Sequence, residues 1–417
     1  MTSIVFLLWI LSAFFIERNG YMFLSLFIIF TVGVLGGILF EKIKIPKIIF
    51  YLIIGILFGS SFLNLIDPSL EAISDYLRQI ALIIILTRSG LALDFKSLIK
   101  IGRPAILMCF LPASFEILGI TIFGPLLLNI SYLEALLLGC VLGAVSPAIV
   151  VPRMLQMIEN EEGKEIPKII MAGSSCDDIY VIVLFYATLN ALKTNNFNFL
   201  SIIGIPTSII LGILLGLILG VLLIYLFKYL KVNSTIKVII MLGISFLMVW
   251  LESALKQYIS ISSLLGVIVM SIMVASKIED VKDVKMSYNR LWSAFEILLF
   301  VLVGTRVKLN LVFSIEGLKI LGLILIGLSF RTIGVILSVI GCHYSFKEII
   351  FFVVAYLPKA TVQASIGAIA LGEGLACGEI VLAASVIAIV FTAPLGALLI
   401  DFLRKKLFIN DGSAKDV

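Results

Sequence analysis

The chain has 417 residues, of which 61% are hydrophobic and 14% are charged. Soluble domains are roughly 45–50% apolar and about 25% charged, so this composition excludes an ordinary soluble protein and predicts an integral membrane protein. The formal charge of +5 is too small to indicate a nucleic-acid partner, and one histidine, His343, cannot make a histidine-rich metal site. The five cysteines have neither metal-binding nor disulfide spacing and are interpreted as packing residues.

Apolar segments follow one another along nearly the whole chain. A helix needs about 20 apolar residues to cross a bilayer, with a range of roughly 17–25. We therefore expect an all-α polytopic membrane protein with about 14 transmembrane helices, or thirteen if the short first segment is not a full span. The predicted spans are 2–16, 22–40, 47–63, 76–93, 104–129, 132–158, 167–191, 199–229, 236–254, 259–276, 291–306, 316–342, 348–370 and 379–403.

The loops between these spans are short and carry most of the charge. We expect residues 1–417 to form a single transmembrane domain in the lipid bilayer, without a soluble nucleotide-binding or regulatory domain. If the N-terminus is inside, most of the 31 basic residues fall in loops on that side, which is the positive-inside rule and predicts that both termini are cytoplasmic. Segment 277–290, KIEDVKDVKMSYNR, is expected to be a solvated cytoplasmic connector.

Two predicted spans carry a proline at mid-depth. The sixth contains LLLGCVLGAVSPAIVVPRMLQM, with Ser146 and Pro147 near its centre, and the thirteenth reads IIFFVVAYLPKATVQASIGAIAL, with Pro358 and Lys359 near its centre. Proline interrupts a helix, and in lipid the freed carbonyl groups need partners from protein or from a water-filled cavity. The two spans are seven apart, an odd number, so they cross the bilayer in opposite directions. Such paired interruptions are typical of the central site of an inverted-repeat transporter.

The same offset of seven spans relates the fifth span to the twelfth. Glu116 lies near the middle of the fifth (FLPASFEILGITIFG), and Arg331 lies near the middle of the twelfth (LILIGLSFRTIGVIL). An ionisable group at the bilayer centre costs at least about 2.5–3.5 kcal/mol, so it normally faces a partner or a cavity. We expect Glu116 and Arg331 to form a salt bridge beside the central site, with either a structural or a tuning role.

A pair of carboxylates lies inside the seventh span, in GSSCDDIYVIVLF. Asp177 and Asp178 point about 100° apart on a helix, so only one of them faces a given cavity directly. Desolvation disfavours the charged form of a carboxylate, so a proton and a hard cation such as Na⁺ can compete for one aspartate. Ser146, Ser174 and backbone carbonyls freed at the breaks are candidate oxygen ligands. Lys359 is expected to face the opposing half-helix ends and to balance their carbonyl dipoles.

The charges of this cluster sum to −1 when all five groups are ionised, because three carboxylates accompany Arg331 and Lys359. One proton or one monovalent cation neutralises that sum, which favours cation exchange over anion transport. Arg88 and Arg153 lie near inner ends of spans and are interpreted as snorkelling or packing groups. Glu296 is deeper and is a candidate for a modulatory role. The glycines of GILLGLILGVLL are interpreted as helix-packing residues.

Taken together, these motifs resemble the sodium/proton antiporters of the cation/proton antiporter superfamily. The resemblance covers essentially the whole chain and rests on SPAIVVP (146–152), SSCDDIYVIVLF, FVLVGTRV and YLPKATVQASIGAIAL (356–371). The last two motifs and the extra N-terminal span make the chain most similar to the NHA clade of sodium/hydrogen exchangers, the 9B-like group. The resemblance implies an NhaA-like antiporter fold, a secondary transporter rather than an enzyme, and no cofactor apart from the transported Na⁺ or Li⁺ and H⁺.

The resemblance also implies a division of labour along the chain. Residues 104–191 and 316–403 would form a mobile ion-transporting core that moves as an elevator, and residues 1–103 and 199–306 would form a dimerisation scaffold and linker helix. Such proteins are homodimers, and a bacterial inner membrane is the expected location. Asp178 would be the main carrier of the cation or proton, with Asp177 beside it.

Arg331 departs from a common pattern in this superfamily. Many relatives with two aspartates place a lysine at this position to pair with the first of them, whereas this chain has Arg331 with Glu116 opposite, as in the NHA branch. The departure leaves electrogenic and electroneutral stoichiometries open. A K⁺/H⁺ antiporter is the main alternative function, and a sodium-coupled organic-anion symporter of similar fold is a weaker one, because spare basic residues for an anion are missing.

Overall fold

The computed structural model describes residues 21–43, 45–59, 62–92, 102–193, 199–255 and 261–409. Every regular element within these ranges is a helix, which confirms the predicted all-α class. Nine of the helices in the described part of the chain are long and apolar enough to cross a membrane, and shorter apolar helices accompany them. The first predicted span, 2–16, lies outside the described residues, and each of the other predicted spans overlaps one or more helices.

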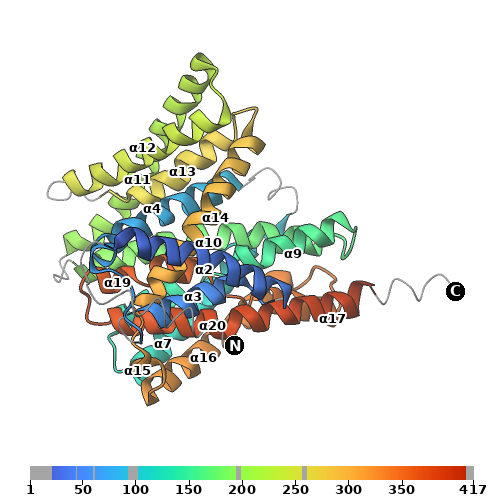
Figure 1. The fold of residues 1–417 in the computed structure, drawn as a ribbon. Helices are drawn as coiled ribbons and strands as arrows, with labels where there is room; N and C mark the ends of the chain where they lie inside the picture. The colour runs from blue at the N-terminus through green and yellow to red at the C-terminus, as the bar shows by residue number, and fades with distance from the viewer. Residues whose placement is uncertain are drawn as a thin grey trace.

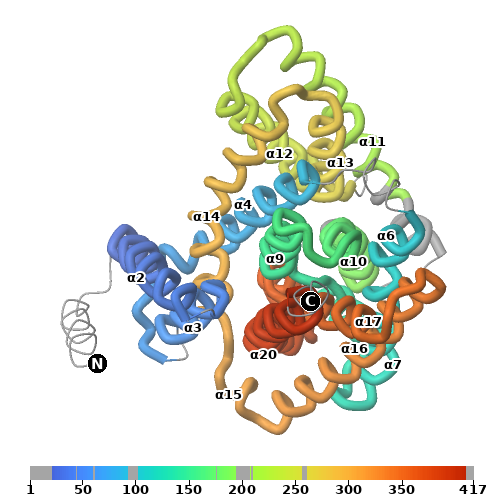
Figure 2. Tube along the Cα trace, turned by 90° about the vertical axis from the view of Figure 1, so that its right-hand side faces the viewer, coloured from blue at the N-terminus to red at the C-terminus, as the bar shows by residue number. Residues whose placement is uncertain are grey.

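The helices pack as two bundles that lie side by side (Figures 1 and 2). One bundle, here called the crossing bundle, contains both interrupted helices. It consists of α6 (Arg103–Met108), α7 (Leu111–Leu128), α8 (Tyr132–Leu142), α9 (Pro147–Glu159), α10 (Ile166–Lys193), α16 (Ile315–Val339), α17 (Phe346–Ala355), α18 (Thr361–Ile366), α19 (Ile369–Gly372) and α20 (Gly378–Arg404), which ends in a π-helical turn, Lys405–Ile409.

The other bundle, here called the flanking bundle, covers one side of the crossing bundle. It consists of α2 (Met22–Lys42), α3 (Lys47–Phe58), α4 (Pro68–Ala92), α11 (Phe199–Leu230), α12 (Ser234–Leu255), α13 (Ser263–Ala275) and α14 (Val281–Thr305). The short helix α15 (Leu309–Val312) leads from it back to the crossing bundle (Figure 2). Helix α4 contacts both bundles, because it packs against α13 and α14 on one side and touches α10 and α18 on the other.

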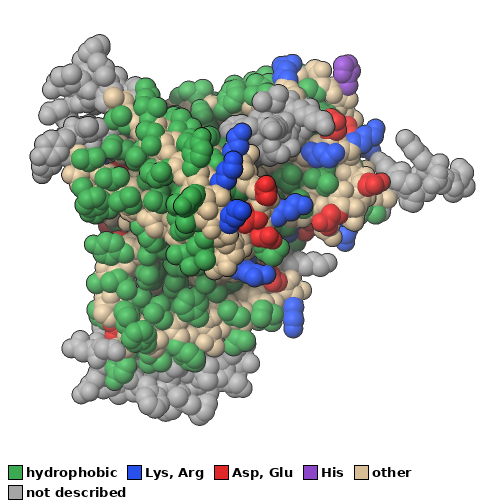
Figure 3. Space-filling model, turned by 90° about the horizontal axis from the view of Figure 1, so that it is seen from above, with side chains coloured by type: hydrophobic (Ala, Val, Ile, Leu, Met, Phe, Trp, Pro, Cys, Tyr) green, Lys and Arg blue, Asp and Glu red, His purple; other side chains and the backbone are tan. Residues whose placement is uncertain are grey.

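Charged side chains gather at one end of the molecule. In Figure 3 hydrophobic side chains cover most of the visible face, and lysine, arginine and acidic side chains collect toward its right-hand end. The end of α9, the start of α17 and the end of α20 lie at the same end in Figure 1, whereas α15 and α19 lie at the opposite one. We call it the charged end. It is the end that the positive-inside rule predicts to be cytoplasmic.

Both predicted helix breaks are present. The sixth span divides into α8 and α9, with the chain non-helical from Gly143 to Ser146 and Pro147 opening the second half. The thirteenth span divides into α17 and α18, with a break at Tyr356–Ala360 that contains Pro358. Helix α9 ends at the charged end and α17 begins there, so the two interrupted helices run in opposite directions (Figure 1).

A third interruption was not predicted. The fifth span divides into α6 and α7 at Cys109 and Phe110, and Pro112 lies in the first turn of α7. Proline is favoured at this position because the missing N–H would have no helical partner there. The apolar run continues through the break, so hydrophobicity alone does not reveal it.

The prediction of a connector over 277–290 is wrong from Val281 onward, because helix α14 begins there. Val284, Tyr288 and Trp292 are buried and follow one another at four-residue spacing. They form one apolar stripe along a helix whose other side is charged. This stripe packs against other helices of the flanking bundle. Burial of the stripe therefore stabilises a helix in a segment whose charged composition had indicated a loop.

Candidate functional site

The two helix breaks meet at the centre of the crossing bundle. The backbone N–H of Ser146, at the first break, donates to the carbonyl of Pro358, at the second, at 2.8 Å. Gln363 of α18 donates from Nε2 to the carbonyls of Val141 and Ala144, at 3.2 and 3.0 Å. These carbonyls are among the groups freed by the first break. Protein groups therefore satisfy the interrupted backbone, as a low-dielectric surrounding requires.

Asp177 is fixed at this crossing. Its Oδ2 accepts a hydrogen bond from the backbone N–H of Val145 at 2.9 Å and an ion-pair contact from Arg331 Nη2 at 2.7 Å. Arg331 Nη1 also donates to the carbonyl of Gly143, at the end of α8. The aspartate is fully buried and Arg331 is 1% exposed. One guanidinium thus ties α16 to α10 and to the first break.

Glu116 of α7 completes the network. Its Oε2 accepts from Arg331 Nη1 at 2.6 Å and from Lys359 Nζ at 2.6 Å. The salt bridge expected between Glu116 and Arg331 is therefore present. The expectation for Lys359 is wrong, because its ammonium group pairs with a carboxylate rather than with the half-helix carbonyls. The flexible lysine stem reaches α7, and the carbonyl dipoles are met instead by Arg331 and Gln363.

The arrangement leaves Asp178 as the uncompensated member of the cluster. Asp177 and Glu116 balance Arg331 and Lys359, so these four groups sum to zero when ionised. Asp178 is 3% exposed, and its Oδ1 is buried without a hydrogen-bond partner in the described part of the chain. The predicted surplus of one negative charge is thereby located on a single side chain. The two aspartates have different surroundings, as their 100° separation on a helix predicts.

Several buried oxygens near the breaks have no hydrogen-bond partner among the described residues. They are Ser146 Oγ, Asp177 Oδ1, Asp178 Oδ1 and Gln363 Oε1. An unsatisfied buried polar group costs about 1–3 kcal/mol, so these atoms are suited to a bound cation or to water. Ser174 differs, since its hydroxyl donates to the carbonyl of Met171 at 3.1 Å. Its oxygen keeps free lone pairs.

The chemistry of these oxygens suits a hard, weakly held cation. The described residues contain no group of three or more histidine, cysteine or acidic side chains that could hold a metal ion. An ion bound here would therefore rely on the Asp177–Asp178 carboxylates together with neutral hydroxyl, amide or backbone oxygens. Oxygen ligands of this kind suit hard cations.

Three functional neighbours were missed by the sequence analysis. Gln363 satisfies the first break, Thr392 Oγ1 accepts from the Lys359 backbone N–H at 2.9 Å, and the ring of Tyr356 lies 5.3 Å from the Arg331 guanidinium carbon. The last distance is that of a cation–π contact. Gln363 carried a usable signal, because an amide one turn after Lys359 in an apolar span needs partners. Thr392 carried none, since threonine is common in membrane helices.

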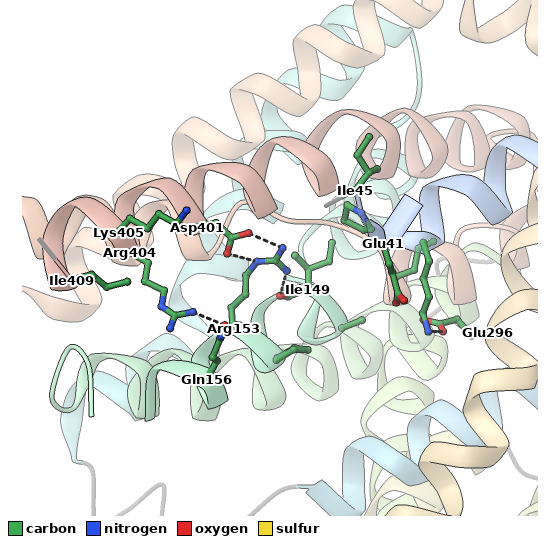
Figure 4. Close-up of a pocket in the computed structure, with 15 residues that line it drawn as sticks. Glu41, Ile45, Ile149, Arg153, Gln156, Glu296, Asp401, Arg404, Lys405 and Ile409 are labelled. Atoms are coloured by element: carbon green, nitrogen blue, oxygen red, sulfur yellow. Dashed lines mark hydrogen bonds and ion pairs between the residues drawn. The ribbon is translucent and has the colours of Figure 1, made fainter. Parts of the chain in front are cut away.

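A cavity of about 660 Å³ opens between the two bundles at the charged end. The crossing bundle contributes α9 and the end of α20, and the flanking bundle contributes the α2–α3 junction and Glu296 of α14 (Figure 4). Arg153 Nε and Nη2 contact the two oxygens of Asp401 at 2.9 and 3.2 Å. Arg153 was interpreted as a snorkelling or a packing group, and this ion pair favours the packing group because it joins α9 to α20.

Comparison with known proteins agrees with this architecture. A model of the transmembrane sodium/hydrogen exchanger family matches residues 4–406. The chain belongs to the sodium/hydrogen exchanger family. Members of this family are transporters, and the protein is accordingly a membrane-embedded exchanger and not an enzyme.

Individual relatives of this exchanger cover most of its length. Sodium/hydrogen exchanger 9B1 of Mus musculus is 34% identical, over 96% of this chain and 74% of that protein. Sodium/hydrogen exchanger 9B2 of Homo sapiens is 31% identical, over 92% of this chain and 74% of that protein. The structure of the sodium proton antiporter MjNhaP1 from Methanocaldococcus jannaschii superposes with a TM-score of 0.75 and 22% identity, over 94% of this chain and 98% of that one. This match confirms the antiporter fold.

Proposed function

We propose that this exchanger moves Na⁺ or Li⁺ in one direction and H⁺ in the other, with both cations competing for Asp178. The observation that carries the proposal is the charge balance of the site. Four ionisable groups neutralise one another, and Asp178 is left buried with an unpartnered oxygen. A buried carboxylate without a counter-ion is strongly disfavoured, so a proton or a monovalent cation completes it.

Asp177 has a supporting role in this proposal. Its Oδ2 is engaged by Val145 and Arg331, and its Oδ1 is free to contribute to a cation bound at Asp178. Ser146 and Ser174 supply neutral oxygens from the first break and from the preceding turn of α10. Pro147 keeps the break open by removing a backbone N–H at the start of α9.

We further propose that the crossing bundle is the moving part. Residues 104–191 and 316–403 would move as an elevator against the scaffold formed by residues 1–103 and 199–306. The hydrogen bond from Ser146 to Pro358 and those from Gln363 support this idea, because they join the two interrupted helices into one unit. The cavity at the charged end would then give ions access from the side predicted to be cytoplasmic.

The protein is also proposed to be a homodimer in a cell membrane, with both termini cytoplasmic. Large apolar side chains are exposed along the outer faces of α2, α11 and α12, and a second copy or lipid would cover them. The bacterial inner membrane stays a prediction, since the 9B1 and 9B2 exchangers named above are proteins of Mus musculus and Homo sapiens.

A vesicle assay tests the exchange function. Everted membrane vesicles are energised, a ΔpH-sensitive dye is added, and dequenching is followed after addition of Na⁺, Li⁺ or K⁺. We expect Na⁺ and Li⁺ to cause dequenching with the wild-type protein, and Asp178→Asn to reduce it to the level of vesicles without the protein. Asp283→Asn, which neutralises an exposed aspartate on α14, is the matched control and is expected to exchange normally.

Other outcomes of this assay identify the alternatives. If Asp178→Asn exchanges cations as fast as the wild type, the assignment of Asp178 as the shared binding residue would be refuted. Dequenching by K⁺ at lower concentrations than Na⁺ would instead support a K⁺/H⁺ antiporter, whose site would use the same oxygens. Sodium-dependent uptake of an organic anion without cation-driven proton movement would support the symporter.

A further inference from the structure

One peptide unit at the first helix break is hydrogen-bonded at both of its polar ends. The carbonyl oxygen of Ala144 accepts from Gln363 Nε2 at 3.0 Å, and the N–H of the same peptide, which belongs to Val145, donates to Asp177 Oδ2 at 2.9 Å. The peptide is trans, as are all peptides among the described residues. A trans peptide is planar, and its C=O and N–H groups point in opposite directions. Gln363 and Asp177 therefore lie on opposite sides of one rigid group.

The amide of Gln363 has one orientation that suits its surroundings. Its Nε2 lies within reach of two carbonyl oxygens, those of Val141 and Ala144, at 3.2 and 3.0 Å. An amide oxygen at this place would face two other acceptors, so the nitrogen with its two hydrogens occupies it. Gln363 is fully buried, and bulk water does not replace these bonds. The donor side of the amide thus faces the first break.

The helical hydrogen-bond ladder does not fix this peptide. Ala144 and Val145 lie in the non-helical stretch between α8 and α9, and both are fully buried. Each residue there keeps two soft backbone dihedral angles, so the direction of the peptide depends on the bonds at its two ends. The bond at the carbonyl end comes from α18. Gln363 therefore fixes the peptide from the side opposite Asp177.

The direction of this peptide decides which oxygen of Asp177 is available to a cation. Oδ2 is held by the Val145 N–H and by Arg331 Nη2 at 2.9 and 2.7 Å, whereas Oδ1 is buried with no hydrogen-bond partner in the described part of the chain. If the N–H turned away, the carboxylate would be free to rotate and to offer both oxygens to the guanidinium, whose geometry suits two parallel hydrogen bonds. The oxygen available to a cation would then be lost.

We propose that Gln363 is a positioning residue for the transported cation and acts on Asp177 through the peptide between Ala144 and Val145. The proposal rests on the cation site proposed at Asp177 and Asp178. Gln363 fixes the peptide, the peptide fixes Oδ2 of Asp177, and Oδ1 stays available. Hydrogen bonds in such a chain polarise one another, so donation to the carbonyl strengthens the N–H group as a donor. Groups that orient a ligand without touching the metal contribute strongly to metal affinity.

The test compares Na⁺ affinity with the maximal exchange rate. Detergent-solubilised full-length protein is titrated with NaCl at one alkaline pH, and Na⁺-dependent thermal stabilisation gives the half-saturating concentration. Exchange in vesicles gives the same quantity and the maximal rate. Gln363→Met keeps the length of the side chain and removes its donors. We expect it to raise the half-saturating Na⁺ concentration about tenfold, while the maximal rate at saturating Na⁺ stays close to that of the wild type.

Two further variants separate positioning from packing and from direct ligation. Ser338→Ala removes a buried hydroxyl group of α16 that donates to the carbonyl of Gly334 at 2.8 Å, and it is expected to change neither quantity. Gln363→Glu keeps the shape but places an oxygen where the donor nitrogen was, so it is expected to weaken Na⁺ binding as Gln363→Met does. A direct ligand would behave in the opposite way, because a carboxylate attracts Na⁺ more strongly than an amide does.

Defined outcomes overturn the inference. An unchanged half-saturating Na⁺ concentration in Gln363→Met, with or without a lower maximal rate, would refute the positioning role and leave the exchange function intact. Tighter Na⁺ binding by Gln363→Glu would show instead that this position contacts the cation directly. If Gln363→Met does not fold, Gln363→Asn decides, since its shorter amide cannot reach both carbonyls and unchanged affinity would contradict the proposal. A wild-type protein with neither Na⁺-dependent stabilisation nor exchange would refute the proposed function itself.

Discussion

Arg331 holds two carboxylates and a backbone carbonyl in the middle of the crossing bundle. It contacts Glu116 and Asp177 at 2.6 and 2.7 Å and donates to the carbonyl of Gly143, while Lys359 supports Glu116 from the other side. Burying ions is costly, and each is tolerated only because the others remain. Removing one partner therefore exposes the remaining charges to the full cost of desolvation.

This network makes a prediction about stability. We expect Glu116→Gln and Arg331→Gln each to lower the free energy of unfolding by about 3–5 kcal/mol, with the larger loss for Arg331→Gln because it also leaves Asp177 unpaired. The double variant should lose less than the sum. Thermal unfolding of the detergent-solubilised protein measures these losses. Strict additivity in the double-mutant cycle would show that the two side chains are not coupled.

An exposed ion pair provides the control for this cycle. Lys308 and Glu379 lie 2.5 Å apart at the surface, with side chains 63% and 47% exposed. Surface pairs contribute about 0–1 kcal/mol. Lys308→Gln should therefore leave the unfolding temperature almost unchanged. The contrast would attribute the losses at Arg331 to burial and not to the removal of a charge as such.

For Gln363, the sequence predicts that the side chain needs hydrogen-bond partners but does not identify them. A polar amide in an apolar span indicates that partners exist, because an unsatisfied amide is expensive in lipid. The identity of those partners, the carbonyls of Val141 and Ala144, depends on which helix crosses at that depth. More than 200 residues separate Gln363 from these carbonyls along the chain, so no local pattern contains the answer.

At the scale of elements, glycines decide how closely α11 and α13 approach. A Cβ added to Gly212 would lie 2.3 Å from the Ser262 carbonyl oxygen, and one added to Gly216 would lie 2.4 Å from the Gly266 carbonyl oxygen. Both contacts are with backbone, which cannot rotate away. The interpretation of the glycine series as a packing surface is therefore confirmed, and α13 is its partner.

Substitution of one of these glycines should separate the two helices. We expect Gly216→Val to lower the unfolding temperature, with a loss of about 1–3 kcal/mol or more from overpacking. Gly243→Val on α12 is the control, because nothing lies within 4 Å of a Cβ at that position. Size-exclusion chromatography and thermal unfolding of both variants measure the effect. Equal unfolding temperatures for the two would contradict the close approach seen between α11 and α13.

At the scale of the whole molecule, a bidentate ion pair at the charged end joins the end of α20 to the loop that follows α9. Arg404, at the end of α20, contacts the two oxygens of Glu162 at 2.6 and 2.9 Å in the loop that follows α9. Hydrogen bonds from this guanidinium lower the pKa of Glu162 below its ordinary value. A carboxylate with a lowered pKa stabilises the folded state above its unfolded pKa, and this contribution is lost as the pH falls through the folded value.

The pH dependence of stability follows from that sign. We expect Glu162→Gln to be less stable than the wild type at neutral pH, and the difference to disappear only in acid, as the pH falls through the lowered pKa of the wild-type carboxyl group. Unfolding temperatures measured across this pH range test the prediction. Glu161→Gln changes the neighbouring exposed carboxylate and should show no such convergence. A difference for Glu162→Gln that persists unchanged in acid would exclude the ion pair as its cause.

The sequence by itself determined the fold class, the two proline breaks and their opposite directions, and the pairing of Glu116 with Arg331. These conclusions depend on hydrophobic length, on the missing N–H of proline and on the parity of spans, which are all properties of the chain read in order. The family follows from the same motifs. The sequence did not predict the start of α14 at Val281, because its burial comes from helices distant in the chain.

Only the tertiary structure decided which charges meet. It paired Lys359 with Glu116 and Asp177 with Arg331, and it left Asp178 uncompensated. Electrostatic partners are set by distances of a few ångströms between groups far apart in sequence. Several assignments of the five central charges satisfy the sequence equally well, and the crossing of α8–α9 with α17–α18 selects one of them.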